Sequence, residues 1–147
     1  MKVLGIAGPS DSGKTTVVAA LVERLRERGT VATVKHLTHD PDIDTDGKDT
    51  ARHRAGGATH TVGLTDAGEW FATGEDRDLD GVLTEFARTY DYAIVEGFSG
   101  SDVPKVVLSD RTAEPPIIAR AANARTLDLD SVVATFEELP PYEPRPD

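Results

Sequence analysis

The residues at positions 8–15 have the types and the spacing of a loop that holds phosphate groups. They match the pattern G-x-x-x-x-G-K-[ST]. In that pattern the glycines let backbone N–H groups turn toward a phosphate, the lysine reaches the outer phosphates, and the final hydroxyl can bind Mg²⁺. We therefore expect a nucleotide site. Its phosphate-binding residues are predicted to be Gly8, Ser10, Asp11, Ser12, Gly13, Lys14, Thr15 and Thr16.

A carboxylate at the tip of another core strand usually completes such a site, because it holds Mg²⁺ directly or through water. Glu96 lies directly after the apolar run 92–95, so we expect Lys14 and Glu96 to act on the phosphates and Thr15 and Glu96 to bind the metal. An ion pair with an arginine is the alternative for Glu96. Asp91 precedes the same strand, about 15 Å away at ~3.3 Å per residue, and we expect it to serve in a turn or cap.

Apolar periodicity predicts the elements that position these groups. Residues 3–7 form a buried strand before the loop, and Val18, Leu21, Val22 and Leu25 recur at helical spacing after it. Further strands are predicted at 31–34, 92–95, 103–108 and 116–119, a hairpin within 58–72, and helices near 49–55, 79–86 and 129–136. The alternation predicts an α/β, P-loop NTPase-like three-layer fold, with a mostly parallel central sheet, helices on both faces and a β-hairpin insertion.

Lys35 and His36 follow the strand 31–34, and a loop rich in aspartate comes after them. Ligands of parallel sheets lie beyond the carboxyl ends of the strands, so we expect both side chains on the nucleotide side. Lys48 in this loop is a further candidate for the nucleotide. Among the loop's aspartates Asp44 is our candidate for Mg²⁺, although a solvated acidic surface is the alternative.

The four histidines, His36, His39, His53 and His60, lie in one stretch among many carboxylates. This clustering raises the hypothesis of a transition-metal site. The spacing contains no helical H-x-x-x-H pair, and the chain has no cysteine to complete a ligand set. We therefore favour His36 as a phosphate or substrate contact.

Length and composition limit the class to which the protein can belong. The 147 residues fit one domain over 1–139, followed by a flexible Pro-rich tail over 140–147. No apolar run approaches the ~20 residues of a membrane span, and no secretory signal follows Met1. We expect a cytoplasmic protein without a membrane contact.

The charge balance restricts the partners. The formal charge is −10, with 26 acidic and 16 basic residues, which argues against a nucleic-acid surface because phosphate neutralisation needs clustered Lys and Arg. The acid-rich, lysine-poor composition is halophile-like, since high ionic strength screens self-repulsion. An ordinary soluble protein is the alternative.

The motifs combine into a specific set, which comprises residues 8–16, 34–36, 39–40, 42–44, 47–50, 91 and 95–98. With this set the chain closely resembles the molybdopterin-guanine dinucleotide biosynthesis protein B family from residue 3 to about residue 108. The resemblance implies a dimeric GTP-binding adapter that assists the guanylyltransferase attaching GMP to molybdopterin. It also implies phosphate and Mg²⁺ binding by Gly13, Lys14, Thr15 and Thr16, with Glu96 as the second acid.

Two other functions stay open. One is a small-molecule P-loop kinase in which Arg52 and Arg54 clamp phosphates and Asp44 or Asp49 acts on a hydroxyl, although the short chain leaves little room for an acceptor domain. The other is a metal-delivery GTPase that uses the histidines from 36 to 60. No arginine finger or water-orienting glutamine can be assigned, so we expect GTP hydrolysis to be slow. The N-K-x-D motif is missing, so the guanine preference rests on the resemblance.

Overall fold

The computed structural model describes residues 1–39 and 48–144 and divides into two compact units. We call Met1–His36 with Val82–Asp147 the sheet unit, and Leu37–Gly81 the hairpin unit. The helix α3 (Leu79–Phe86) crosses the boundary between them. Each unit is described below by itself.

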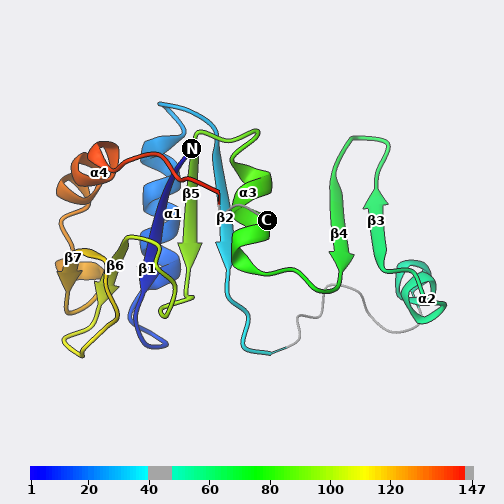
Figure 1. Ribbon diagram of the computed structural model, residues 1–147, viewed down its shortest axis with the longest axis horizontal. Coiled ribbons are helices and arrows are strands. Elements are labelled where there is room, and N and C mark those ends of the chain that lie inside the picture. The colour runs from blue at the N-terminus through cyan, green and yellow to red at the C-terminus, as the bar shows by residue number, and fades with distance from the viewer. Residues whose placement is uncertain (40–47, 145–147) are drawn as a thin grey trace. The chain divides into compact units, whose positions relative to one another are not determined.

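The sheet unit contains a five-stranded sheet in the order β2-β5-β1-β6-β7, in which every neighbouring pair is parallel (Figure 1). The strands are β1 (Lys2–Ala7), β2 (Val31–Lys35), β5 (Tyr92–Glu96), β6 (Lys105–Leu108) and β7 (Ile117–Ala121). In the register, Glu96 is paired with Ile6 on one side and with Lys35 on the other. The carboxyl ends of β1, β2 and β5 therefore meet at one edge.

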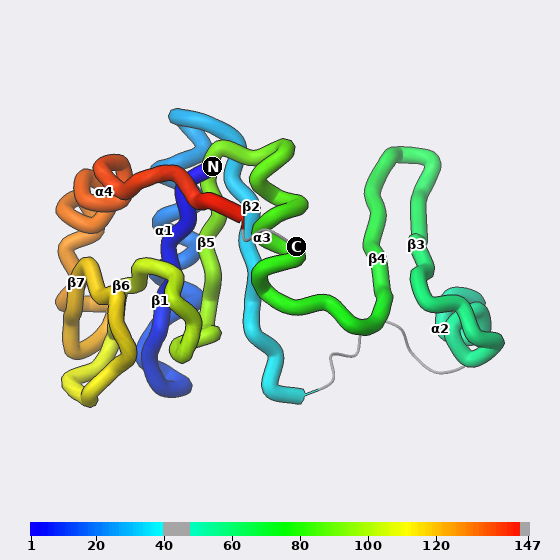
Figure 2. The backbone as a smooth tube through the Cα atoms, in the orientation of Figure 1, coloured from blue at the N-terminus to red at the C-terminus, as the bar shows by residue number. Residues whose placement is uncertain are grey.

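In the core of the sheet unit, α1 (Lys14–Leu25) and α4 (Leu129–Glu138) pack against the sheet. Helix α4 starts where the Asp128 carboxylate accepts hydrogen bonds from two backbone N–H groups, a cap that contributes about 1 kcal/mol. A short 3₁₀ helix, η1 (Ala124–Thr126), precedes it. At the end of the chain the Tyr142 N–H donates to the Met1 carbonyl oxygen, and Figure 2 shows this red segment beside the blue N-terminal strand.

The hairpin unit contains α2 (Asp49–Ala55) and the antiparallel pair β3 (His60–Leu64) and β4 (Trp70–Gly74). The turn between the strands uses Gly68 at φ +84°, a conformation that glycine adopts without strain. Val62, Leu64 and Trp70 are exposed.

The sheet, its helices and the hairpin confirm the predicted fold class. The inner face of α1 differs slightly from the prediction: its buried residues are Val17, Leu21 and Leu25, whereas Val18 and Val22 are only partly buried. Residues four apart lie on the same face of a helix, so these three side chains form one buried stripe. None of the helices within the described ranges combines the length and apolarity that crossing a bilayer requires.

Candidate nucleotide-binding site

The loop between β1 and α1 has a backbone that only glycine permits at two points. Gly13 has φ +91°, and a Cβ there would lie 2.5 Å from the Ala124 Cβ. Gly8 has φ +155°, and a Cβ there would lie 2.7 Å from the Ser12 Oγ. Both the dihedral angles and the lack of space therefore explain the two glycines of the pattern.

The first turn of α1 lies at this loop and is suited to an anion. The helix has no acidic residue in its first turn and no side-chain cap, so its N-terminal N–H groups and partial positive charge remain available. The Lys14 Nζ donates to the carbonyl oxygens of Gly8 (2.9 Å) and Pro9 (2.8 Å), which places an ammonium across the loop. The buried Ser12 Oγ has no hydrogen-bond partner among the residues that the structure describes.

Glu96 lies at the carboxyl end of β5 and connects the loop to β2. Its Oε1 accepts a hydrogen bond from the Thr15 hydroxyl at 2.9 Å and lies 3.3 Å from the Lys35 Nζ. The Glu96 side chain is 9% exposed and that of Lys35 is 55% exposed. A nearly buried carboxylate thus lies next to the hydroxyl that ends the phosphate loop, and a lysine rather than an arginine is its ionic partner.

The residues after Glu96 pack against the end of β2. The rings of His36 and Phe98 are stacked, with centroids 4.3 Å apart and planes inclined by 25°. Gly97 has φ +86°, and a Cβ on it would lie 2.8 Å from the His36 Cβ. His36 therefore lies at the predicted edge of the sheet, where one ring face is taken up by Phe98.

The structure places the remaining candidates as follows. Asp91 accepts hydrogen bonds from the Thr30 N–H (2.8 Å) and hydroxyl (2.9 Å), which lower the pKa of its carboxyl group and join the residues that precede β5 and β2. Lys48 belongs to the hairpin unit, where it precedes α2. Asp44 lies outside the described residues. Within the described parts of the chain, no three His, Asp or Glu side chains form a group that could hold a metal ion.

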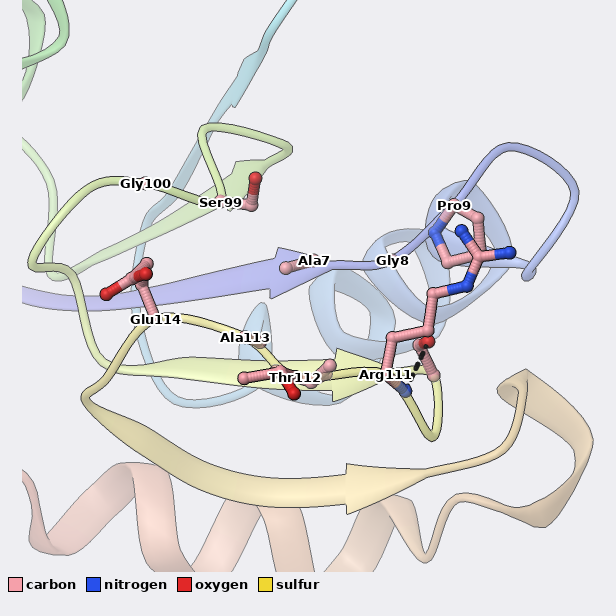
Figure 3. A pocket seen from close by; sticks show the side chains of 11 residues that line it. Ala7, Gly8, Pro9, Ser99, Gly100, Arg111, Thr112, Ala113 and Glu114 are labelled. Carbon is pink, nitrogen blue, oxygen red and sulfur yellow. Dashed lines mark hydrogen bonds between the residues drawn. The ribbon is translucent and has the colours of Figure 1, made fainter.

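Sequence reasoning missed a cavity of about 330 Å³ next to the start of the phosphate loop. It is lined by residues of that loop and of the loops after β5 and β6, including Arg111 and Glu114 (Figure 3). The position of residues 109–114 directly after a parallel strand was a usable signal, because ligands bind beyond such strand ends.

The parallel sheet, the glycine-dependent loop after β1 and the acid at the end of β5 define a protein of the P-loop NTPase-like class. Comparison with known families narrows this class. The sequence model of the family described as "Molybdopterin guanine dinucleotide synthesis protein B" matches residues 3–133, and the chain belongs to this family. The family predicted from the sequence is thereby confirmed.

Individual relatives agree with this assignment. A Haloferax volcanii protein named "Probable molybdopterin synthase" is 36% identical over 142 residues, covering 97% of this chain and 49% of the relative. The "Molybdopterin-guanine dinucleotide biosynthesis adapter protein" of Haemophilus influenzae is 30% identical over 149 residues, covering 94% and 83%. The crystal structure of Bacillus subtilis MobB is similar with a TM-score of 0.68 and 26% identity, covering 91% and 97%. The chain spans about half the length of the Haloferax relative.

Proposed function

We propose that this protein binds GTP with Mg²⁺ and serves as an adapter in the attachment of GMP to molybdopterin. The observation that carries the proposal is the contact of Thr15 with Glu96 beside the phosphate loop. The family and the adapter role named for its Haemophilus relative support the pathway. The preference for guanine also rests on the family, because the chain has no N-K-x-D motif.

The loop fits a chain of phosphates. Gly13, at φ +91°, lets the loop turn into α1 against Ala124, and the helix N-terminus offers N–H donors without a competing side-chain cap. Lys14 carries its ammonium on this loop, and among the described residues the hydroxyl of Ser12 has no hydrogen-bond partner. A phosphate oxygen would satisfy the Ser12 hydroxyl and the helix N–H groups, and it would accept a charge-assisted hydrogen bond from Lys14 in place of the loop carbonyl oxygens.

The donor set also fits Mg²⁺. Hydroxyl and carboxylate oxygens are the hard ligands that this ion prefers, and Thr15 and Glu96 supply one of each. The Oε1 atom of Glu96 already faces Thr15 and Lys35, so we assign its Oε2 atom to the metal or to a metal-bound water. The ion would neutralise charge on the phosphates. Asp44 remains a candidate for a further ligand.

Slow hydrolysis is part of the proposal. Efficient phosphoryl transfer needs a positioned water and cationic stabilisation beyond the loop lysine and the metal. Lys35 is engaged by Glu96, and the sequence assigns no arginine finger and no water-orienting glutamine. We therefore assign the nucleotide a binding and delivery role, with weak GTPase activity at most.

A homodimer is proposed from the hairpin unit. Leu64 pairs with Trp70 and Val62 with Ala72 in the antiparallel register, so these four side chains share one face of the hairpin. Leu64 is 73% and Trp70 67% exposed. Because an isolated two-stranded hairpin is marginally stable and apolar patches mark interfaces, a second copy of the chain is the occupant we assign. The cytoplasm is the compartment we assign to this dimer and its guanylyltransferase partner.

Two measurements test the function. Isothermal titration of GTP with Mg²⁺ should show binding to the wild type and a loss of about tenfold or more in Lys14→Ala, because charge-assisted contacts to phosphate are lost. The exposed Arg88→Ala variant is the control and should bind like wild type. A reconstituted assay should show faster formation of the guanine dinucleotide when the chain is added to the guanylyltransferase. Equal GTP affinity of Lys14→Ala and wild type would refute the phosphate-loop assignment.

A further inference from the structure

The cavity of about 330 Å³ in the sheet unit adjoins the phosphate loop at Gly8 and Pro9, but its remaining lining residues take no part in the nucleotide contacts assigned above. Its walls come from three segments that meet at the carboxyl ends of β1, β5 and β6. They contribute Gly8 and Pro9 from the phosphate loop, Ser99 and Gly100 after β5, and residues 109 and 111–114 after β6. Figure 3 shows these segments around the opening.

The loop 109–114 is held in shape at its start by Arg120 on β7. The Arg120 Nη1 donates to the carbonyl oxygens of Ser109 (2.7 Å) and Arg111 (2.6 Å). The Ser109 Oγ accepts a further hydrogen bond from the Arg111 N–H at 3.0 Å. The backbone that carries the Arg111 side chain is therefore fixed by three hydrogen bonds.

A buried cation holds the other end of the same loop. Lys105 is 1% exposed, and its Nζ donates to the carbonyl oxygens of Ser101 and Glu114. Burial lowers the pKa of the Lys105 ammonium, while the carboxylates of Asp102 and Glu114 raise it. Lys105 thus ties the loop after β5 to the loop after β6, and a pre-formed pocket loses less entropy when it binds a ligand.

The side chains of Arg120 and Lys105 donate hydrogen bonds to backbone carbonyl oxygens. The Arg111 guanidinium makes no such bond within the described residues. Within residues 1–39 and 48–144, no carboxylate lies at ion-pair distance from it. In Figure 3 the Arg111 side chain extends toward Pro9, and Glu114 lies at the other end of the loop with Thr112 between them. Arginine binds phosphate through two parallel N–H groups, and a carboxylate accepts hydrogen bonds from amino and ring N–H groups.

We propose that this cavity binds a second small molecule, a phosphate monoester of an amino-substituted heteroaromatic ring. Its phosphate contacts Arg111, and the N–H edge of its ring contacts Glu114. The inference rests on the proposed function, in which GMP is joined to the phosphate of a pterin. Both a pterin phosphate and GMP carry this chemistry, and the probes below separate them.

The test is isothermal titration of the full chain with neopterin 3′-phosphate, GMP and ribose 5-phosphate. We expect Arg111→Gln to weaken the binding of neopterin 3′-phosphate by about tenfold or more, since charge-assisted hydrogen bonds are lost. Glu114→Gln should weaken the binding of neopterin 3′-phosphate and GMP, which carry a ring, and leave the affinity for ribose 5-phosphate unchanged. The matched control Arg88→Gln removes an exposed arginine outside the cavity and should bind like wild type, and melting temperatures confirm that each variant is folded.

The two proposals fail separately in this design. Lys14→Ala should retain the neopterin 3′-phosphate affinity while losing GTP, because the contacts assigned to the probe are with Arg111 and Glu114 and not with the Lys14 ammonium, which is not among the residues that line the cavity. Three outcomes would each overturn the cavity assignment. Lys14→Ala could fail to bind neopterin 3′-phosphate, Arg111→Gln could bind it with the affinity of the wild type, or the wild type could bind neither neopterin 3′-phosphate nor GMP. If the wild type does not bind GTP but binds neopterin 3′-phosphate in a way that depends on Arg111, the GTP proposal alone is refuted. The ring-bearing probe that binds more tightly identifies the ligand source.

Discussion

Replacing Glu96 by Gln keeps the size of the side chain and removes its charge. An amide oxygen can still accept from the Thr15 hydroxyl, which lies 2.9 Å from the Oε1 atom. The hydrogen bond becomes neutral and loses about 1 kcal/mol. The Lys35 partner is 55% exposed, so the loss of that ion pair costs less than about 1 kcal/mol because solvent screens it. We therefore expect the free energy of unfolding to fall by about 1 to 2 kcal/mol.

The effect on Mg²⁺ should be much larger than the effect on folding. Removing a carboxylate from the metal's surroundings costs about 10- to 100-fold in metal affinity. GTP affinity measured in EDTA should change by less than about threefold, because the predicted phosphate contacts of Gly13 and Lys14 are intact. The assay is isothermal titration of GTP at a series of Mg²⁺ concentrations, in wild type and in Glu96→Gln.

Asp91→Asn is the matched control, because it removes a carboxylate just before the other end of β5. Its Mg²⁺ dependence should equal that of the wild type. If the curves for Glu96→Gln and wild type coincide as well, Glu96 does not serve the metal, and our reading of the contact between Thr15 and Glu96 is wrong.

Gly13→Ala should abolish GTP binding and lower the melting temperature, because its Cβ would lie 2.5 Å from that of Ala124; a melting temperature and titration equal to wild type would contradict this. Trp70→Ser should convert the dimer to a monomer in sedimentation while leaving GTP affinity unchanged, whereas an unchanged mass would remove the hairpin from the interface. The pKa of Asp91 is lowered in the folded state by Thr30, so its stabilisation is present above the unfolded pKa and lost as pH falls through the folded pKa; denaturant unfolding of Asp91→Asn should show a deficit at pH 7 that shrinks at acidic pH. Raising NaCl from 0.1 to about 2 M should raise the melting temperature if screening of the −10 charge dominates, and a fall would contradict the halophile-like interpretation.

Much of the site was predictable because it is local in sequence. The glycines, lysine and threonine of the loop lie within residues 8–15, and the position of Glu96 followed from the end of an apolar strand. Parallel pairing then brought Lys35 beside Glu96, as expected for side chains at neighbouring strand ends. The family was recognisable for the same reason, since its motifs are short and contiguous.

The strand end before residues 109–114 signalled a place where a ligand can bind, but the shape of the cavity there was not predictable. Its shape depends on Lys105, which the sequence presents as one lysine at the start of an apolar strand. Only the fold shows that the ammonium is buried and donates to the carbonyl oxygens of Ser101 and Glu114. Contacts between residues that are distant along the chain leave no periodic signal.

The packing of His36 against Gly97 and Phe98 has a mechanical consequence. His36 is the last residue of the sheet unit before the chain continues into the hairpin unit at Leu37. Its ring rests on Phe98, two residues beyond Glu96, and its Cβ leaves no space for a side chain at position 97. A displacement of the backbone after Glu96 would therefore displace His36, the residue at which the chain leaves the sheet unit.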